Sequence, residues 1–335
     1  MLDVVCVGDA IIDVFLNISK DNPHFGLDEK NNKLEISFGE KINVESYTLD
    51  VGGNAANTCV GLAKLGLSTA ILAEIGKDEF AEKILNKFKN ENINSEHVIL
   101  TNDQKTSFSV GINYNGERTL FVEHVQRKHE FNFENLSTKL IYLTSLGKEW
   151  EKAYQDTLSF VEKNGVKLAF NPGTLQIEDR GKFLNEIIEK TDYMFLNKEE
   201  AELILYGKEL EISSDKGNDN IIKKLLFGIK SIGAKNVIIT DSINGSYVFD
   251  ESNNLYKSPI IKVDVLEKTG AGDGFTAGFL GAILNNLTIS DACIWGTINA
   301  SSVITQIGAQ KGLLSKPMLL EKEKNLSNFN ILKIE

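Results

Sequence analysis

The chain has 335 residues, of which 42% are hydrophobic and 25% are charged, so it can bury enough apolar surface to fold. Its formal net charge of −11 argues against a general nucleic-acid binder, because such proteins need a basic surface. Three widely spaced cysteines, no signal-peptide pattern and no long apolar run together predict a cytoplasmic protein that does not enter a membrane.

Short β-rich runs alternate with helical patterns, which predicts an α/β fold with a mostly parallel sheet covered on both faces. The first elements are a strand over Asp3–Phe15, a helix over Asn54–Gly66, a strand over Thr69–Gly76 and a helix over Asp78–Asn90. Later strands are predicted over Leu140–Ser145, Val166–Phe170, Tyr193–Leu196 and Val237–Thr240, and later helices over Glu149–Asn164, Lys182–Glu189, Lys198–Leu205, Asn218–Ile232, Asp273–Leu284 and Ser290–Ile307. We expect a single domain over residues 1–335.

Two segments break this rhythm and alternate polar with apolar residues. They are Leu34–Asp50 and Thr106–Glu123, and the second contains Asn115-Gly116 as a turn signal. We interpret them as a small β-sheet lid formed by inserted segments at about residues 16–51 and 105–128. Edge strands of the main sheet are the alternative. Because such strands leave apolar faces and open edges, we expect the lid to join two chains into a homodimer.

The segment Thr269–Phe275 follows a β-rich run and opens a predicted helix. Gly270 and Gly272 let the backbone amides turn toward one point and form, with Ala271, an anion hole at the helix N-terminus. Asp273 lies in the first helical turn, where a carboxylate can take a proton from a hydroxyl while the amides hold a phosphoryl group. An aspartate here can also be a simple helix cap. The small residues after it are unnecessary for a cap and favour catalysis.

A second segment, Gly52–Asn57, precedes the first predicted helix. Gly52 and Gly53 let a ligand lie against bare backbone, and Asn57 offers donors and acceptors to hydroxyl groups. A loop with an asparagine cap is the alternative. Asp13 falls at the end of the first predicted strand, on the side where open α/β sheets bind ligands. These residues predict a site for a ligand that carries hydroxyl groups.

Together these segments resemble the ribokinase-like, or PfkB, family of carbohydrate and nucleoside kinases. Residues 52–66 (GGNAANTCVGLAKLG) are similar to its N-terminal signature, and residues 264–278 (DVLEKTGAGDGFTAG) are similar to its C-terminal one. Between them, residues 197–200 (NKEE) match the family's Asn-x-x-Glu motif. The resemblance covers nearly the whole chain. It implies a three-layer α/β/α fold with a small lid, and transfer of phosphate from ATP to a hydroxyl.

The resemblance also implies a role for each matching position. Asp273 would be the general base, and the amides of Gly270, Ala271 and Gly272 would be the anion hole. Substrate hydroxyls would be held by Asp13, Gly52, Gly53 and Asn57. ATP would be bound by Asn197, Glu200, Thr240, Gly245, Thr297 and Asn299, with Glu200 reaching Mg²⁺ through water.

Three positions depart from the family's pattern. Ser242 replaces the middle glycine of the nucleotide-binding turn over Thr240–Gly245. Glu267 stands where members with a monovalent-cation site carry aspartate, which leaves K⁺ activation open. Ile11 stands where ribose kinases carry an asparagine, which argues against ribose itself.

The leading hypothesis is therefore an ATP-dependent kinase for a small sugar. A nucleoside kinase of the same family is the alternative, for which aromatic side chains on the lid segments would support the base. These are Phe38, Phe108, Tyr114 and Phe121. A sugar-binding protein without catalysis is a weaker alternative, because binding alone needs no base. The sequence does not choose between the substrates.

Overall fold

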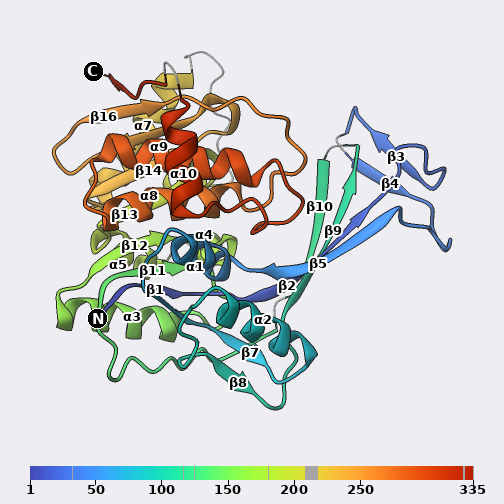
Figure 1. Cartoon of the computed structure of the whole chain (residues 1–335), viewed down its shortest axis with the longest axis horizontal. Helices are drawn as coiled ribbons and strands as arrows, with labels where there is room; N and C mark the ends of the chain where they lie inside the picture. Colours follow the sequence, from blue (N-terminus) through green and yellow to red (C-terminus); the bar gives the residue numbers. More distant parts are fainter. Residues whose placement is uncertain are drawn as a thin grey trace.

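The body of the molecule is built on a large sheet (Figure 1). A computed structural model describes all residues except 32, 116, 124, 180, 208–217, 327–328 and 335. In the described part the main sheet has nine strands in the order β17-β16-β15-β14-β13-β12-β11-β1-β6. From β14 to β6 the strands are parallel, whereas β15, β16 and β17 pair antiparallel. The bounds are β1 Leu2–Val7, β6 Thr69–Leu72, β11 Thr138–Thr144, β12 Lys167–Asn171, β13 Tyr193–Asn197, β14 Asn236–Thr240, β15 Ser246–Phe249, β16 Leu255–Ser258 and β17 Leu332–Ile334.

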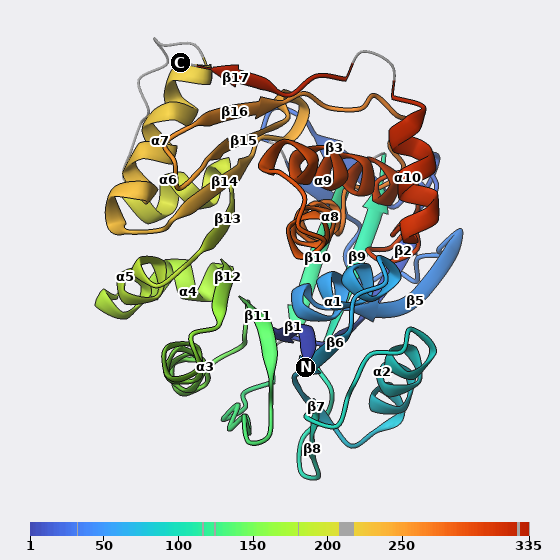
Figure 2. The same ribbon diagram turned by 60° about the vertical axis from the view of Figure 1, so that its left-hand side comes forward.

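Helices cover both faces of this sheet (Figure 2). One face carries α1 Asn54–Lys64, α2 Glu79–Asn90, α8 Ala271–Leu284, α9 Ile289–Val303 and α10 Lys316–Lys324. The other carries α3 Glu151–Asn164, α5 Lys182–Glu189, α6 Lys198–Tyr206 and α7 Asn218–Ile232, with the short α4 Thr174–Asp179 beside α6. The predicted three-layer α/β fold is thus confirmed. In the described part of the chain, no helix is long and apolar enough to cross a membrane.

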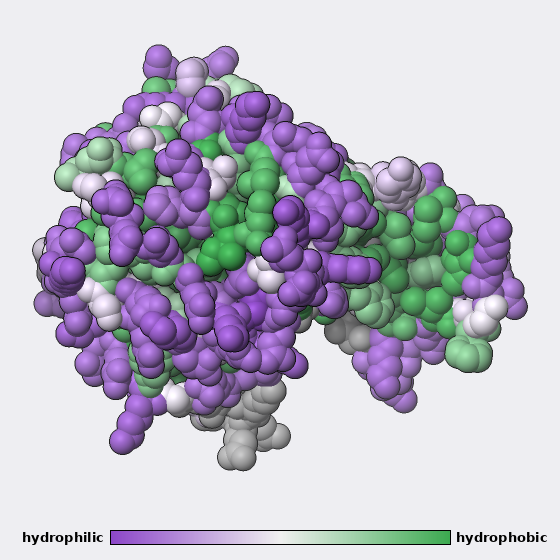
Figure 3. Space-filling view, turned by 90° about the horizontal axis from the view of Figure 1, so that it is seen from below, coloured by the Kyte–Doolittle hydropathy of each residue, from purple (hydrophilic) through white to green (hydrophobic). Residues whose placement is uncertain are grey.

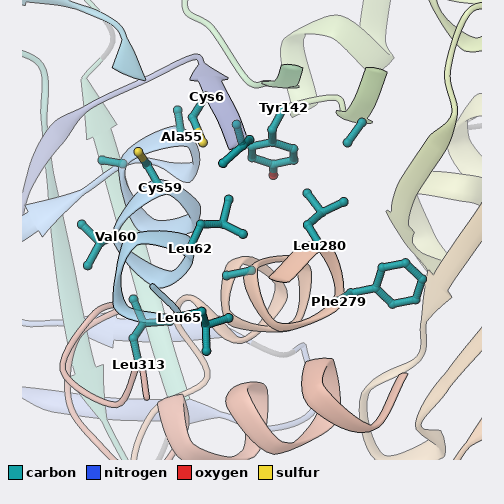
Figure 4. Close-up of a cluster of buried hydrophobic side chains, with 14 of the residues drawn as sticks. Cys6, Ala55, Cys59, Val60, Leu62, Leu65, Tyr142, Phe279, Leu280 and Leu313 are labelled. Atoms are coloured by element: carbon teal, nitrogen blue, oxygen red, sulfur yellow. The ribbon is translucent and has the colours of Figure 1, made fainter. Parts of the chain in front are cut away.

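The core on the α1 and α8 side is where the two signature segments meet (Figure 4). Cys6 of β1 and Tyr142 of β11 lie under Leu62 of α1 and Leu280 of α8, and all four side chains are fully buried. Phe279 extends this cluster, because its ring lies 5.4 Å from Phe195 and 6.4 Å from Tyr193. Apolar packing therefore fixes the beginnings of α1 and α8 relative to the parallel strands.

A smaller sheet projects from the body and forms the lid (Figure 1). Its strand order is β10-β9-β2-β5, and a separate pair, β3-β4, lies at its far end. The bounds are β2 Ile11–Asn17, β3 Phe25–Asp28, β4 Lys33–Ile36, β5 Ser46–Gly52, β9 Phe108–Tyr114 and β10 Glu117–Glu123. A further pair, β7 Glu74–Gly76 and β8 Ile99–Thr101, lies at the opposite end of the body from β17.

Two predictions about these strands were wrong. The run over Asp3–Phe15 is not one strand, because β1 belongs to the main sheet and β2 belongs to the lid. The chain changes sheet at Gly8, where a Cβ atom would lie 2.7 Å from Thr144 Cγ2. The segment Leu34–Asp50 is not one hairpin either, because β4 pairs with β3 whereas β5 pairs with β2. Gly116 of the expected turn lies outside the described residues, and its neighbour Asn115 has a φ of 51°.

The two faces of the lid differ in chemistry. Asp13 lies directly opposite Asp50 of β5 and Ser109 of β9, so these three side chains share one face. Phe108 and Phe121 occupy alternate positions and therefore lie on the other face. Seen from below, the projecting lid carries a broad hydrophobic surface (Figure 3). Phe15 and Leu120 also share the face of Asp13, so that face carries both polar and apolar side chains.

Truncation of Phe279 tests the core described above. This side chain is fully buried among aromatic rings, so Phe279→Ala should lower the free energy of unfolding by about 3–5 kcal/mol. Urea denaturation followed by circular dichroism measures this loss. The control is Ile243→Ala, because 79% of Ile243 is exposed and its truncation should change stability by less than about 0.5 kcal/mol. Equal stability of the two variants would contradict this account of the core.

Candidate active site

The predicted functional segments meet at the carboxyl ends of the parallel strands, where the lid joins the body. α1 begins there after Gly53, and α8 begins there after Gly270. The two beginnings are linked by a hydrogen bond in which Asn57 Nδ2 donates to Asp273 Oδ2 at 2.8 Å. Residues 216 positions apart in the sequence are thereby joined in a buried contact.

The turn before α8 brings three backbone amides together, of which Ala271 N donates to Lys268 O at 3.3 Å. Gly270 has a φ of 75°, and a Cβ atom there would lie 2.5 Å from Ala309 Cβ, so only glycine fits. Gly272 faces open space, because nothing lies within 4 Å of its Cβ direction. The amides of Gly270, Ala271 and Gly272 stand at a helix N-terminus, where the positive end of the helix dipole favours an anion.

Asp273 is buried immediately beside this turn, with 8% of its surface exposed. Burial raises its pKa to about 7, and the hydrogen bond from Asn57 opposes that shift. The carboxylates of Asp13 and Glu200 raise the pKa further. A carboxyl group with this pKa can hold or release a proton near neutral pH.

Asp13 extends from the lid and is as buried as Asp273, with 7% of its surface exposed. Its Oδ1 accepts a hydrogen bond from Ser109 Oγ at 2.5 Å, and burial raises its pKa. Gly52 is required next to it, because a Cβ atom at Gly52 would lie 1.9 Å from Asp13 Oδ2. Gly53 is the N-terminal cap residue of α1 with a φ of 93°. The predicted substrate residues therefore do come together.

Glu267 connects the lid, the signature segment and a loop after α9. Its carboxylate accepts hydrogen bonds from Gly308 N at 2.8 Å and from the Thr269 hydroxyl, and it forms an ion pair of 3.4 Å with Arg118 of β10. Three donors, one of them positively charged, already neutralise this side chain. K⁺ binding near Glu267 stays a prediction from the sequence, and we assign no step to K⁺.

The predicted ATP-binding residues divide into two groups. Asn197 and Glu200 form a capping box at the start of α6, in which each side chain accepts the other residue's backbone N–H at 2.8 Å. Burial raises the pKa of Glu200 to about 7. Thr240 ends β14, and Gly245 follows the short turn after it. All four lie at the same end of the sheet as Asp273.

Thr297 and Asn299 have interior partners instead. The Thr297 and Ser258 hydroxyls lie 3.0 Å apart. Asn299 Nδ2 donates to Gly274 O at 2.8 Å, and Asn299 Oδ1 accepts from Leu314 N at 3.0 Å. The structure thus places Asn299 as a brace for the first turn of α8, and we withdraw the prediction that its side chain binds ATP.

The departure at Ser242 also has a structural counterpart. Its φ is 46°, in the left-handed region that glycine adopts without strain. The turn therefore keeps its shape although the glycine has been replaced.

Comparison with known proteins agrees with this geometry. The model of the pfkB family of carbohydrate kinases matches residues 1–316. The chain belongs to this family. It is accordingly an ATP-dependent kinase of the type that phosphorylates sugars or nucleosides.

Several relatives match this pfkB-family kinase over most of their length. The nucleoside kinase of Methanocaldococcus jannaschii is 26% identical over 96% of this chain and 97% of its own. The ribokinase of Haemophilus influenzae is 27% identical over 84% of this chain and 90% of its own. The crystal structure of the M. jannaschii nucleoside kinase superposes with a TM-score of 0.76, at 24% identity over 97% of this chain and 99% of that one.

The pfkB-family kinase has no dedicated metal cage in its described residues, since no three His, Cys, Asp or Glu side chains cluster as ligands there. Mg²⁺ in kinases binds mainly to nucleotide phosphates and water, with one or two carboxylates nearby. Glu200 is the carboxylate that fits, because it lies close enough to Asp273 to raise the pKa of that group.

Two residues of this site were missed by sequence reasoning. Ser109 and Gln310 are almost completely buried and contact Asp13 and Asn57, respectively. Ser109 lies within the period-two segment, so its side of the strand could have been matched to Asp13. Gln310 carries no local signal, because its partner is 253 residues away.

Asp273→Asn should change how stability depends on pH. Asp273 has a folded pKa of about 7, whereas an unfolded aspartate titrates near about 4. Between these pH values the folded state retains a proton that the unfolded state releases. The contribution of Asp273 to the free energy of unfolding is therefore present at low pH and is lost as the pH rises. The free energy of unfolding of the variant, relative to that of the wild type, should therefore rise by up to about 1.4 kcal/mol per pH unit between about pH 5 and pH 7. Urea denaturation at several pH values measures the free energy of unfolding of both proteins. A difference between them that does not change with pH would contradict the raised pKa of Asp273.

Proposed function

We propose that this protein transfers the γ-phosphoryl group of ATP to a hydroxyl of a small neutral sugar, with Asp273 as the general base. The observation that carries this proposal is the position of a buried carboxyl group, with a pKa of about 7, beside the glycine turn at the start of α8. A base and an anion hole in contact are what phosphoryl transfer to an alcohol needs.

The steps follow from these groups. The substrate hydroxyl oxygen attacks the γ-phosphorus while the hydroxyl proton passes to Asp273, and the bond from phosphorus to the ADP oxygen breaks. The amides of residues 270–272 stabilise the charge on the transferring group. Asp13 and the Gly52–Gly53 backbone hold other substrate hydroxyls, and Asn197, Glu200, Thr240 and Gly245 position the nucleotide. Bound Mg²⁺ would neutralise phosphate charge.

A neutral substrate is supported by the charges around Asp13. Glu267 and Asp50 raise the pKa of Asp13, whereas Arg118 lowers it. Arg118 is itself paired with Glu267. A phosphate or carboxylate on the substrate would therefore meet a mainly negative surface. Hydroxyl groups, which donate to carboxylates, suit this surface better.

The aromatic side chains of the lid support a sugar over a nucleoside. Phe108 and Phe121 lie on the face of the lid opposite to Asp13, and Tyr114 donates its hydroxyl to Phe25 O at 3.2 Å. None of these three therefore forms the shelf for a base that the sequence suggested. Phe38 is fully exposed on the segment between β4 and β5. The nucleoside kinase relative keeps a nucleoside as the alternative substrate class.

The proposed substrate class is tested by ADP formation with ATP, Mg²⁺ and a panel of acceptors. The panel contains D-fructose, D-ribose, adenosine, fructose 6-phosphate and gluconate. We expect the highest kcat/KM with a neutral sugar. A preference for adenosine would establish the nucleoside alternative, and a preference for either anionic acceptor would refute the argument from charge.

Asp273→Asn should abolish most of this activity. Loss of a general base lowers turnover by about 10²–10⁴-fold, and ATP binding should change little because the amide turn remains. Steady-state kinetics with the best acceptor, combined with calorimetric titration of ATP, separates the two effects. Turnover near the wild-type value would show that another group takes the proton.

We also propose that the protein works in the cytoplasm, where its buried free cysteines stay reduced. Two chains would associate there through their lids. The lid face opposite to Asp13 exposes 37% of Phe108 and 55% of Phe121, and Ile36 and Phe38 are exposed at the far end of the lid, on and after β4. The outer strands β10 and β5 are open edges of the lid sheet. A second copy would cover these groups, and Val110 lies on the same face.

Light scattering at micromolar concentration should therefore give twice the mass of one chain. Phe121→Asp should shift the protein to monomers, because it places a charge in the proposed contact. The control, Met318→Asp, changes a residue of similar exposure on α10 and should leave the mass unchanged. A monomeric wild-type protein would rule out this association.

A further inference from the structure

Three buried polar side chains lie in a row behind the proposed catalytic centre. Gln310 Nε2 donates to Asn57 Oδ1 at 2.9 Å, and Asn57 Nδ2 donates to Asp273 Oδ2 at 2.8 Å. Gln310 is 1% exposed and Asn57 is 4% exposed. The row therefore joins a loop after α9, the first turn of α1 and the first turn of α8 inside the protein.

The donor and acceptor groups determine which side chain donates in each hydrogen bond of this row. An ionised Asp273 can only accept hydrogen bonds, so Asn57 must present its N–H group to it. The amide oxygen of Asn57 then points the other way and needs a donor, which Gln310 supplies. If that donor were lost, Asn57 could turn its oxygen toward Asp273 without breaking any other side-chain contact found for it in the described residues.

We propose that Gln310 is a positioning residue, which holds the Asn57 amide in the orientation that donates to Asp273. This proposal rests on the proposed function, in which Asp273 is the base. It extends that function by adding a residue that touches neither reactant and acts through Asn57.

The other end of the Gln310 side chain supports this role. Gln310 Oε1 is buried and has no hydrogen-bond partner in the described part of the chain. A glutamine kept only for its shape would be replaced without loss by an apolar residue, because a buried unpaired carbonyl is unfavourable. The N–H end is therefore the part of this side chain that the structure uses.

The loop that carries Gln310 is fixed on both sides. Gly308 N donates to Glu267 before it, and Leu314 N donates to Asn299 after it. Lys64 of α1 also donates to Leu313 O at 3.3 Å. Gln310 is thus held in place by contacts that do not depend on Asn57, as a positioning group must be.

Asp273 is faced by groups that oppose its ionised form. Asp13 from β2 and Glu200 from α6 both raise its pKa, and the Tyr142 hydroxyl from β11 lies within electrostatic range. The hydrogen bond from Asn57 is the interaction that lowers the pKa. Loss of the Gln310 donor should therefore raise the pKa of Asp273, whereas a purely structural role for Gln310 predicts no change in this pKa.

The test follows the titration of Asp273 by ¹³C NMR in protein labelled at the aspartate carboxyl carbons. The Asp273 signal is assigned by its absence from Asp273→Asn. Gln310→Met and Gln310→Leu both remove the donor but differ in shape, so a common effect reports the lost hydrogen bond. Gln176→Met is the control, because Gln176 is a fully buried glutamine hydrogen-bonded to Leu146 O and Gly173 N instead.

We expect the Asp273 midpoint to rise by about half a pH unit or more in both Gln310 variants and to stay unchanged in Gln176→Met. The acidic limb of the pH–rate profile with the best acceptor should move by the same amount. Unchanged midpoints in the folded Gln310 variants would overturn the proposal. If Gln310→Met fails to fold, Gln310→Leu provides the same reading, and failure of both to fold would show a structural role and also overturn it.

These outcomes are separate from those that test the proposed function. If Asp273→Asn is inactive but the midpoint does not move, the base is assigned correctly and Gln310 does not position it. If the midpoint moves but Asp273→Asn remains active, the row exists and another group is the base.

Discussion

The arrangement of the site depends on one constraint, the burial of a carboxyl group at the first turn of a helix. Burial there raises the pKa of Asp273, and the hydrogen bond from Asn57 offsets part of the cost of its negative charge. Neighbouring residues hold this helical turn in place. Gly270 allows the sharp turn, and Asn299 braces the carbonyl of Gly274. The run of small residues after Asp273 has a different purpose, because a Cβ atom at Gly278 would lie 2.4 Å from Trp295 O. That run allows α8 to lie close to α9 and is explained by packing.

A second buried carboxylate ties the lid to this turn. Glu267 is only 6% exposed, and an unpaired charge so deeply placed would be strongly unfavourable. Its partners come from three parts of the chain: Arg118 on the lid, Thr269 in the signature segment and Gly308 in the loop after α9. A displacement of the lid would therefore break contacts on which the turn before α8 also depends.

The sequence predicted the parallel strands well, because each is a short run of β-branched and aromatic residues followed by a helical pattern. It could not show that the run from Asp3 to Phe15 serves two sheets, since β1 and β2 have the same pattern and only three residues separate them. The short antiparallel strands β15 and β17 were missed, whereas β16 lies within the β-rich run that precedes Thr269.

The site shows the same limit. The motifs located Asp273 and the turn beside it, because those residues are neighbours in the sequence. An amide side chain gives no such information, since Asn57 and Asn299 offer the same groups to a ligand or to the protein interior. Only the folded chain shows that Asn57 faces Asp273 and Gln310, whereas Asn299 faces Gly274 and Leu314.

The division of the first predicted strand has a mechanical consequence. Asp13 lies on β2, which is part of the lid, whereas Asp273 lies on α8, which is part of the body. The inclination of the lid therefore sets the separation between Asp13, which we propose holds the acceptor, and Asp273, which we propose takes its proton. If the lid tilts when an acceptor binds to Asp13, the same tilt changes the distance from that acceptor to Asp273.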